Sequence, residues 1–131
     1  MKYLLDTGIF LWSVGTSGKL NQQAQELLAD ETQEIYLSAA SSWEITIKFT
    51  LGKLRLPEAP ERFIPAQMLI GGIRQLPITH YHALEVGKLE GFHNDPFDRI
   101  LIAQARREGM VLLTSDSLFS KYDVETMWCG K

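Results

Sequence analysis

Four acidic residues follow apolar segments of the chain, and their side chains are of a type that binds hard metal ions. Asp6 comes directly after the short apolar run 3–5, and Asp116 comes shortly after the apolar run 110–114. The complete set is Asp6, Glu44, Asp98 and Asp116. Carboxylates that crowd together repel one another unless they are protonated or share a cation. If the segments that carry them meet at one edge of a parallel sheet, the four acids predict one divalent metal site.

The chemistry of such a site follows from its ligands. Carboxylate oxygens favour Mg²⁺ or Mn²⁺ over Zn²⁺, so we expect Mg²⁺ as the cofactor, with Mn²⁺ as a substitute. A magnesium ion keeps several of its waters, and a metal-bound water is a suitable nucleophile for phosphodiester cleavage. The pattern therefore favours hydrolysis of a phosphodiester.

Each acid also has an ordinary structural explanation. Asp6 and Asp116 would cap the helix or turn that follows them. Ser41 and Glu44 have the Ser-x-x-Glu spacing of a capping box. Asp95 is expected to cap the helix that Pro96 begins, and Asp98, at the third position of that helix, would be favoured by the helix dipole. For any one acid alone the structural explanation is the better one. The joint placement of all four favours a metal site.

The elements that would position these acids alternate along the chain. Strands are expected at 3–5, 34–38, 75–78, 110–114 and 124–128, with Pro77 placing the third near an edge of the sheet. Helices are expected at 9–14, 21–30, 40–51, in the 60s before Gly71, at 80–90 and at 96–108. Such alternation is typical of an α/β fold in which helices cover both faces of a mostly parallel central sheet, giving three layers. Ligands of such sheets bind beyond the carboxyl ends of the strands.

Length and composition limit the remaining choices. The chain has 131 residues, the length of one domain, and we expect a single domain over residues 1–131. Its residues are 45% hydrophobic and 22% charged, which excludes a disordered chain. The net charge of −3 argues against a protein held on nucleic acid by bulk positive charge. It does not exclude an enzyme that acts on nucleic acid through bound cations.

Cysteine use and apolar runs bear on the compartment. The single cysteine, Cys129, cannot form a disulfide within the chain, so nothing indicates an oxidising compartment. We expect it to be an inert residue of the C-terminal tail. The apolar start carries Asp6 and has no small-residue cleavage site, unlike a signal peptide. No apolar run approaches the roughly 18 residues of a membrane span. We expect a cytoplasmic protein without membrane association.

Four sequence blocks stand in a particular order and spacing over nearly the whole chain. They are LLDTGIFLW at 4–12, SAASSWEITIKFTLGKLRLP at 38–57, DPFDRILIAQA at 95–105 and LLTSD at 112–116. Together they resemble the PIN-domain family, and more narrowly the VapC-type toxins of bacterial toxin–antitoxin pairs. One departure is Gly8, where relatives often carry His or Asn after the Asp-Thr pair. It leaves the acids intact but puts a substrate contact from that position in doubt.

The resemblance implies a function and assigns roles to residues. It implies a compact PIN-like α/β fold, a Mg²⁺-dependent endoribonuclease, a homodimer and a cognate antitoxin that blocks the site. It makes Asp6 and Asp98 the principal metal ligands, with Asp116 and Glu44 completing the site directly or through water. Thr114 matches a position that supports the site by hydrogen bonding. In-line attack on RNA would leave a 5′-phosphate and a 3′-hydroxyl.

Several charged residues near these motifs keep two interpretations. Lys48 lies four residues after Glu44, so the two would pair on one helix face, and a phosphate contact is compatible with that pairing. Arg99 adjoins Asp98 and would orient carboxylates, meet substrate or remain a surface charge. The basic residues of the middle of the chain would form an RNA track or a solvated surface; they are Lys53, Arg55, Arg62 and Arg74.

Histidines and apolar residues are weaker candidates. His93 lies close to the DPFD segment and would approach the same edge of the sheet, but isolated histidines are poor indicators of catalysis, and none is included in the site. Trp12, Trp43 and Phe97 are expected in a core or a dimer interface rather than stacked on bases. The segment 68–73 would form either an apolar groove for an antitoxin helix or a buried core helix.

Three other functions compete with a nuclease. A phosphatase with an aspartyl nucleophile would usually have a second acid two residues after Asp6, where Gly8 stands. A phospho-acceptor module would have paired acids near the first strand, which are absent, and a lysine late in the chain, for which Lys121 is the candidate. A catalytically inactive PIN-like module that binds RNA or a protein partner is the remaining alternative, but all four acids are present.

Overall fold

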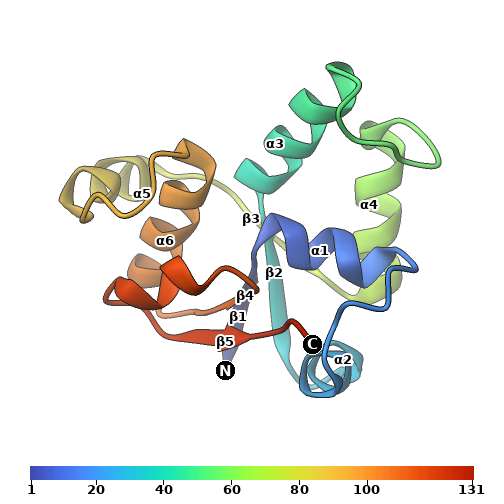
Figure 1. The fold of residues 1–131 in the computed structure, drawn as a ribbon, viewed down its shortest axis with the longest axis horizontal. Helices are drawn as coiled ribbons and strands as arrows, with labels where there is room; N and C mark the ends of the chain where they lie inside the picture. Colours follow the sequence, from blue (N-terminus) through green and yellow to red (C-terminus); the bar gives the residue numbers. More distant parts are fainter.

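The computed structural model describes residues 1–131 and contains one five-stranded sheet (Figure 1). The strands are β1 (Lys2–Leu5), β2 (Glu34–Ser38), β3 (Arg74–Leu76), β4 (Val111–Thr114) and β5 (Thr126–Trp128). Their order across the sheet is β3-β2-β1-β4-β5, and every neighbouring pair is parallel. The mostly parallel sheet expected from the sequence is therefore confirmed, and β3 is an edge strand as Pro77 indicated.

Six α-helices and two short 3₁₀-helices connect the strands. The α-helices are α1 (Thr7–Val14), α2 (Gln22–Ala29), α3 (Ala39–Thr50), α4 (Pro60–Gly71), α5 (His80–Glu85) and α6 (Pro96–Glu108). The 3₁₀-helices are η1 (Val86–Lys88) and η2 (Ser117–Lys121). None of the helices combines the length and the apolar character that crossing a membrane requires.

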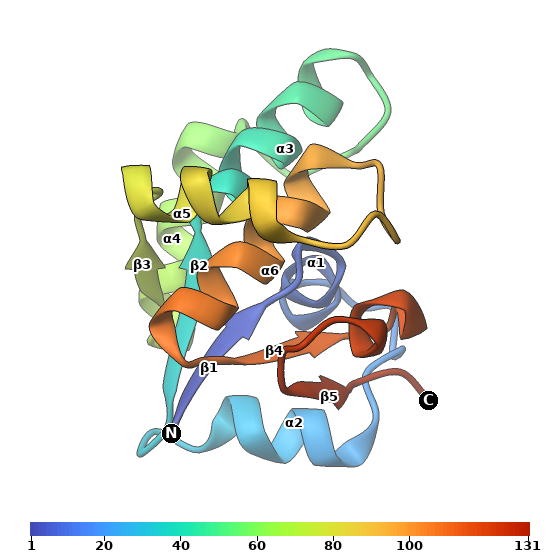
Figure 2. The ribbon, with the colours of Figure 1, turned by 90° about the vertical axis from the view of Figure 1, so that its left-hand side faces the viewer.

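The sheet forms the middle of three layers. Alternate strand residues point to opposite faces, so Leu5 and Leu113 contribute to one core cluster while Leu4 and Leu112 contribute to the other. The first cluster packs the sheet against α1, α2, α3 and α4, and the second packs it against α6 and η2. Figures 1 and 2 show α5 and α6 together on one side of the sheet, away from α1, α2 and α4. The expected α/β, PIN-like layering is confirmed.

One helix ends earlier than the sequence predicts, and another begins at a different cap residue. The helix expected over 80–90 is regular only to Glu85 and then tightens into η1, because the Arg99 guanidinium takes the backbone carbonyls of Val86, Leu89 and Glu90. The capping box that was the alternative explanation of Ser41 and Glu44 does not form. The N-cap of α3 is Ser38, three residues before Ser41, and its side chain accepts a hydrogen bond from the Ala40 amide.

Other sequence predictions about helix ends and the cysteine can be compared directly. Asp95 caps α6 by accepting hydrogen bonds from the amides of Phe97 and Asp98, as expected. Gly109 ends α6 with φ of 65°, a backbone conformation that glycine adopts at little cost. Cys129, expected as an inert tail residue, is fully buried in the first core cluster. That burial raises the pKa of its thiol to about 11, which keeps it unreactive.

Candidate functional site

Asp6 stands where β1 passes into α1, and its side chain does not cap the helix. The Asp6 amide donates to the Leu113 carbonyl at 2.9 Å, which ties the end of β1 to β4. Asp6 occupies the N-cap position of α1, yet its side chain makes no capping hydrogen bond. The Asp6 carboxylate instead accepts a hydrogen bond from the Thr114 hydroxyl, with Oγ1 and Oδ2 2.9 Å apart. The structural explanation of Asp6 as a helix cap is therefore not supported.

Thr114 links Asp6 to a second acid. Its hydroxyl oxygen also accepts the backbone N–H of Asp116, at 3.0 Å, while its own hydrogen goes to Asp6. The supporting role expected for Thr114 thus has a geometric basis. Asp116 begins η2 and accepts the Leu118 amide on Oδ1 at 2.9 Å, so this acid does cap the following turn as well as facing the site.

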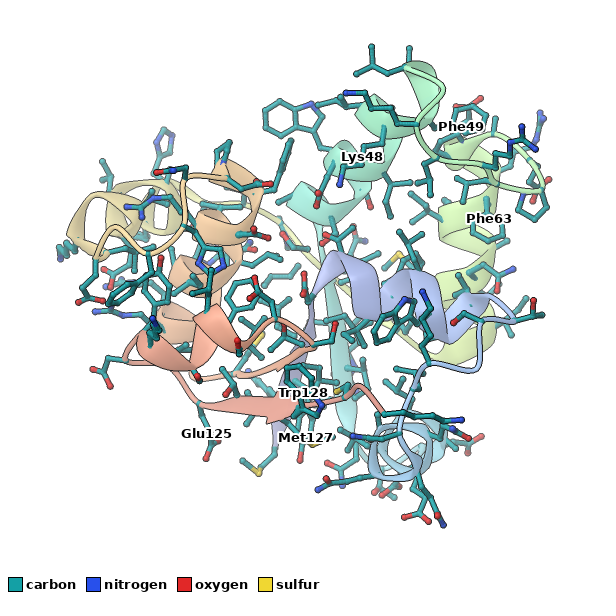
Figure 3. The ribbon with its side chains drawn as sticks, viewed as in Figure 1. Lys48, Phe49, Phe63, Glu125, Met127 and Trp128 are labelled. Atoms are coloured by element: carbon teal, nitrogen blue, oxygen red, sulfur yellow. The ribbon has the colours of Figure 1, made fainter.

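Glu44 reaches the same region from α3. The Thr7 hydroxyl donates to the Ser41 hydroxyl at 2.8 Å, which ties the start of α1 to the first turns of α3. Residues three apart share a helix face, so Glu44 lies on the side of α3 that faces Asp6. Glu44 is buried and pairs with Lys48, whose Nζ lies 2.8 Å from its Oε2. The predicted Glu44–Lys48 pairing is confirmed, and half of the Lys48 side chain stays exposed. Figure 3 shows Lys48 on α3.

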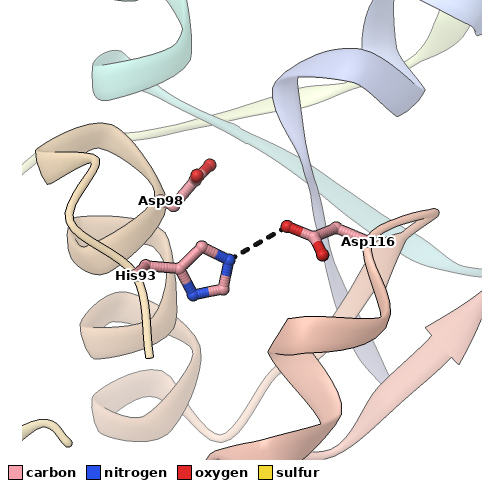
Figure 4. Close-up of side chains that lie close together, drawn as sticks. All are labelled: His93, Asp98 and Asp116. Atoms are coloured by element: carbon pink, nitrogen blue, oxygen red, sulfur yellow. Dashed lines mark hydrogen bonds and ion pairs between the residues drawn. The ribbon is translucent and has the colours of Figure 1, made fainter. Parts of the chain in front are cut away.

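Asp98 approaches from α6. Pro96 at the first position of this helix and the Asp95 cap fix where the helix begins, and this start places Asp98 in its first turn. One carboxylate oxygen of Asp98, one of Asp116 and a ring nitrogen of His93 all lie within 4.8 Å of one another. Figure 4 shows these three side chains converging from α6, η2 and the loop before α6.

Electrostatics shows that the four acids interact. Burial, more than any other cause, raises the pKa of Asp6 to about 6, and the charges of Glu44 and Asp116 add to the increase, while the hydrogen bond from Thr114 and the nearby Thr7 amide oppose it. Burial is also the main cause that raises the pKa of Asp98 to about 7, and the charges of Asp95, Asp6 and Glu44 raise it further. Because each of these charges acts only at short range, the four predicted acids lie close to one another.

Asp116 behaves differently from the other two aspartates. Its partial burial alone would raise its pKa, but hydrogen bonds from His93 and the Leu118 amide outweigh this, and its pKa is lowered. Asp116 therefore keeps its charge, whereas Asp6 and Asp98 hold their protons more tightly than ordinary aspartates. Raised pKa values on buried, clustered acids are a common property of functional sites.

The donor set fits a hard divalent cation. Asp6 and Asp98 lack an ion pair with lysine or arginine, since the only such pair among the four acids joins Glu44 to Lys48. A cluster of like charges without basic partners is relieved by protonation or by a cation, and carboxylate oxygens select Mg²⁺ or Mn²⁺. The residues present are thus suited to hold such an ion.

His93 and Arg99 have contacts that sequence reasoning did not assign. Nε2 of His93 lies 2.9 Å from Oδ2 of Asp116, although no histidine was included in the predicted site. The only feature of the sequence that pointed to His93 was its position two residues before Asp95. The Arg99 guanidinium donates to carbonyls of the loop 86–93, including that of His93 at 3.3 Å, and so holds this loop instead of orienting the carboxylates.

Comparison with known proteins identifies the class of protein that this fold and site define. The family model described as the PIN domain matches residues 3–125, and the chain belongs to the PIN domain family. Within that family it is related to the VapC ribonuclease toxins of VapBC toxin–antitoxin systems.

Three relatives illustrate the relationship. Ribonuclease VapC16 of Mycobacterium tuberculosis is 38% identical over 60 residues, a stretch that spans 46% of this chain and 43% of that protein. The structure of VapBC2 from Rickettsia felis bound to a DNA fragment from its promoter superposes with a TM-score of 0.75 at 15% identity, covering 98% of this chain and 99% of the other. DNA-bound VapBC from Salmonella typhimurium gives a TM-score of 0.68 at 16% identity, covering 97% of each chain. These two structures share the fold.

Proposed function

We propose that this protein is a Mg²⁺-dependent endoribonuclease that acts as the toxin of a toxin–antitoxin pair. The observation that carries the proposal is the convergence of Asp6, Glu44, Asp98 and Asp116 beyond the carboxyl ends of β1, β2 and β4, with the pKa raised at Asp6 and Asp98. Relationship to VapC ribonucleases supports RNA as the substrate.

The residues have distinct roles in this proposal. Asp6 and Asp98 would hold the ion directly, and Asp116 and Glu44 would complete the site directly or through water. A bound Mg²⁺, or Mn²⁺ in its place, would supply an activated water and offset the charge on the phosphate that water attacks. Thr114 keeps one oxygen of Asp6 oriented, and the exposed half of Lys48 is available to a phosphate.

An antitoxin partner is part of the proposal. An open groove of about 880 Å³ lies between α3, α4, β2 and β3, and α4 contributes Met68 and Leu69 to its wall. Leu69 is 85% exposed and Ile70 is 77% exposed, whereas the alternative of a buried core helix would cover them. Apolar surface of this kind suits an amphipathic helix, and the solved VapBC structures with this fold contain the two components together.

A homodimer is also part of the proposal, and a second apolar surface is available for it. Trp43 of α3 is 61% exposed although it packs edge-on against Phe97, with ring centroids 5.1 Å apart. Tyr81 and Leu84 of α5 are 69% and 72% exposed. We assign the contact between two copies to the surface around Trp43, where Ala83 and Phe97 line the same apolar hollow, because exposed apolar patches commonly mark interfaces.

The experiment that tests the activity is cleavage of RNA by the purified chain with Mg²⁺, with EDTA, and with the variants Asp98→Asn and Asp95→Asn. Asparagine is as good a helix cap as aspartate, so Asp95→Asn is a matched control that should cleave RNA normally. Cleavage lost with EDTA and with Asp98→Asn, but kept with Asp95→Asn, is the expected result. Cleavage that survives EDTA or Asp98→Asn would contradict the proposal.

A binding module without activity is the alternative, and a further readout separates it. An active toxin should arrest growth when it is expressed, and Asp98→Asn should relieve the arrest. Equal growth with both chains, together with no cleavage of any RNA tested, would favour the inactive module.

A further inference from the structure

His93 is a buried side chain at the site that the four-acid proposal does not use. Its ring stacks on Phe119 and Tyr122, with centroid separations of 4.6 and 5.5 Å. Its backbone N–H donates to the Tyr122 hydroxyl at 2.8 Å, and its carbonyl accepts from Arg99. Only 5% of the His93 side chain is exposed. Stacking fixes the imidazole, and hydrogen bonds fix the backbone that carries it.

The hydrogen bonds around the imidazole define its direction. Nε2 lies 2.9 Å from Oδ2 of Asp116, and Nδ1 lies 3.2 Å from the Tyr122 hydroxyl. Two unprotonated acceptors would repel at the first distance, so a proton lies between Nε2 and the carboxylate. The Tyr122 oxygen also accepts the His93 backbone N–H, so Tyr122 contacts both the ring and the backbone of His93. The imidazole is thereby oriented with its Nε2–H pointing at Asp116.

We propose that His93 is a positioning residue that orients the Asp116 carboxylate for the metal site, with Tyr122 fixing the orientation of the imidazole. This inference rests on the proposed function in that it takes the four acids to be the metal site. Asp116 is held on both oxygens, Oδ2 by His93 and Oδ1 by the Leu118 amide. A carboxylate oxygen has two lone pairs, so each oxygen keeps one for a cation.

Two further hydrogen bonds connect Asp116 to Asp6 through Thr114. The Asp116 amide donates to Thr114 and the Thr114 hydroxyl donates to Asp6. One continuous chain of hydrogen bonds therefore runs from Tyr122 through His93, Asp116 and Thr114 to Asp6. Outer partners of this kind fix the geometry of metal ligands, and their loss typically weakens metal affinity about 10–100-fold.

Direct coordination of the ion by His93 is the competing arrangement, because its ring nitrogen lies within 4.8 Å of oxygens of Asp98 and Asp116 (Figure 4). The two arrangements differ in a measurable way. A histidine ligand couples its ¹⁴N nucleus to bound Mn²⁺, whereas a positioning histidine leaves the metal with oxygen neighbours only.

The test is titration of the full chain with Mn²⁺, followed by the electron paramagnetic resonance signal of the free ion, which requires no RNA. His93→Leu keeps a bulky side chain but removes the donor, and we expect it to weaken Mn²⁺ binding at least tenfold. His93→Gln keeps an N–H donor and should restore most of the affinity. Tyr122→Phe keeps the stacked ring without the hydroxyl and should give an intermediate loss.

Controls keep the outcomes distinct. His82→Gln changes a buried histidine that pairs with Glu108 outside the acidic site, and it should leave Mn²⁺ affinity unchanged. Melting of each metal-free variant reports its folding, and Tyr122→Phe and His93→Gln carry the test if His93→Leu unfolds. Unchanged affinity in folded His93→Leu, or in Tyr122→Phe where His93→Leu unfolds, would overturn the inference. So would a ¹⁴N coupling in the pulsed spectrum of bound Mn²⁺.

Failure of the proposed function gives a different result. If Mn²⁺ binding depends on Asp98 and His93 but no RNA is cleaved, the positioning role stands and the ribonuclease proposal fails. If Asp98→Asn binds Mn²⁺ as well as the unaltered chain does, the ion does not occupy the four-acid site and both proposals fail.

Discussion

Replacing Asp6 with asparagine should stabilise the metal-free protein while it removes a proposed metal ligand. Burial and the neighbouring charges raise the pKa of Asp6 from 3.8 to about 6, so the folded state binds this proton more tightly than the unfolded chain does. The stability that comes from protonated Asp6 is complete below pH 3.8 and is lost as the pH rises through about 6. At neutral pH the charged carboxylate therefore opposes folding.

The magnitude follows from that difference in pKa. At about 1.36 kcal/mol for each pH unit, the charge on Asp6 costs about 3 kcal/mol of folding free energy at pH 8. Asparagine carries no charge, and its oxygen still accepts the Thr114 hydroxyl, but burying its amide group offsets part of the gain. We expect Asp6→Asn to raise the free energy of unfolding by about 2 kcal/mol at pH 8, and by less than about 1 kcal/mol at pH 5.

Urea unfolding in EDTA measures this effect, because the chelator removes any stabilisation by bound metal. Asp123→Asn removes an exposed acid outside the site and serves as a control that should change stability little. The reasoning is refuted if Asp6→Asn is no more stable than the unaltered chain at pH 8. It is also refuted if the gain is the same at pH 5 as at pH 8, since the effect would then not come from the carboxylate charge.

Three further predictions concern the metal, a helix end and the proposed dimer. Because the pKa values of Asp6 and Asp98 are raised to about 6 and about 7, protons compete with the cation. Mn²⁺ affinity measured by calorimetry should fall as the pH drops from 8 to 5.5, and a pH-independent affinity would contradict this. Gly109→Ala should cost about 1 kcal/mol in urea unfolding, because φ there is 65°. Gly87→Ala, where an added Cβ meets nothing within 4 Å, should cost less. Trp43→Ser should convert the dimer to a monomer in sedimentation velocity, and a variant that still dimerises would show that the contact lies elsewhere.

The sequence was sufficient to predict the layered fold and the meeting of the four acids. Apolar runs such as 110–114 and helical stretches alternate clearly, and parallel strands deliver the residues that follow them to one edge of the sheet. The sequence also distinguished the roles of Asp95 and Asp98, because a proline directly after Asp95 indicates that Asp95 caps a helix. These features depend on short stretches of chain, which is why they can be recognised before the structure is known.

The features that sequence reasoning missed depend on contacts between distant segments. The position of His93 is set by Tyr122, which lies 29 residues later. No pattern in the sequence around either residue predicts that contact. The end of α5 is set by Arg99 of α6, which binds the carbonyls that a longer helix would have used. The capping box at Ser41 failed because Ser38 offers an earlier cap, and the Thr7 hydroxyl donates to the Ser41 side chain instead.

The most direct measurement of the central claim is the anomalous scattering of Mn²⁺ in crystals of the protein. If the four acids form one divalent metal site, the map will show a peak in contact with carboxylate oxygens of Asp6 and Asp98, and Asp98→Asn will abolish it. A protein that takes up no Mn²⁺ at these acids, or that binds it at another place unaffected by Asp98→Asn, would contradict the account.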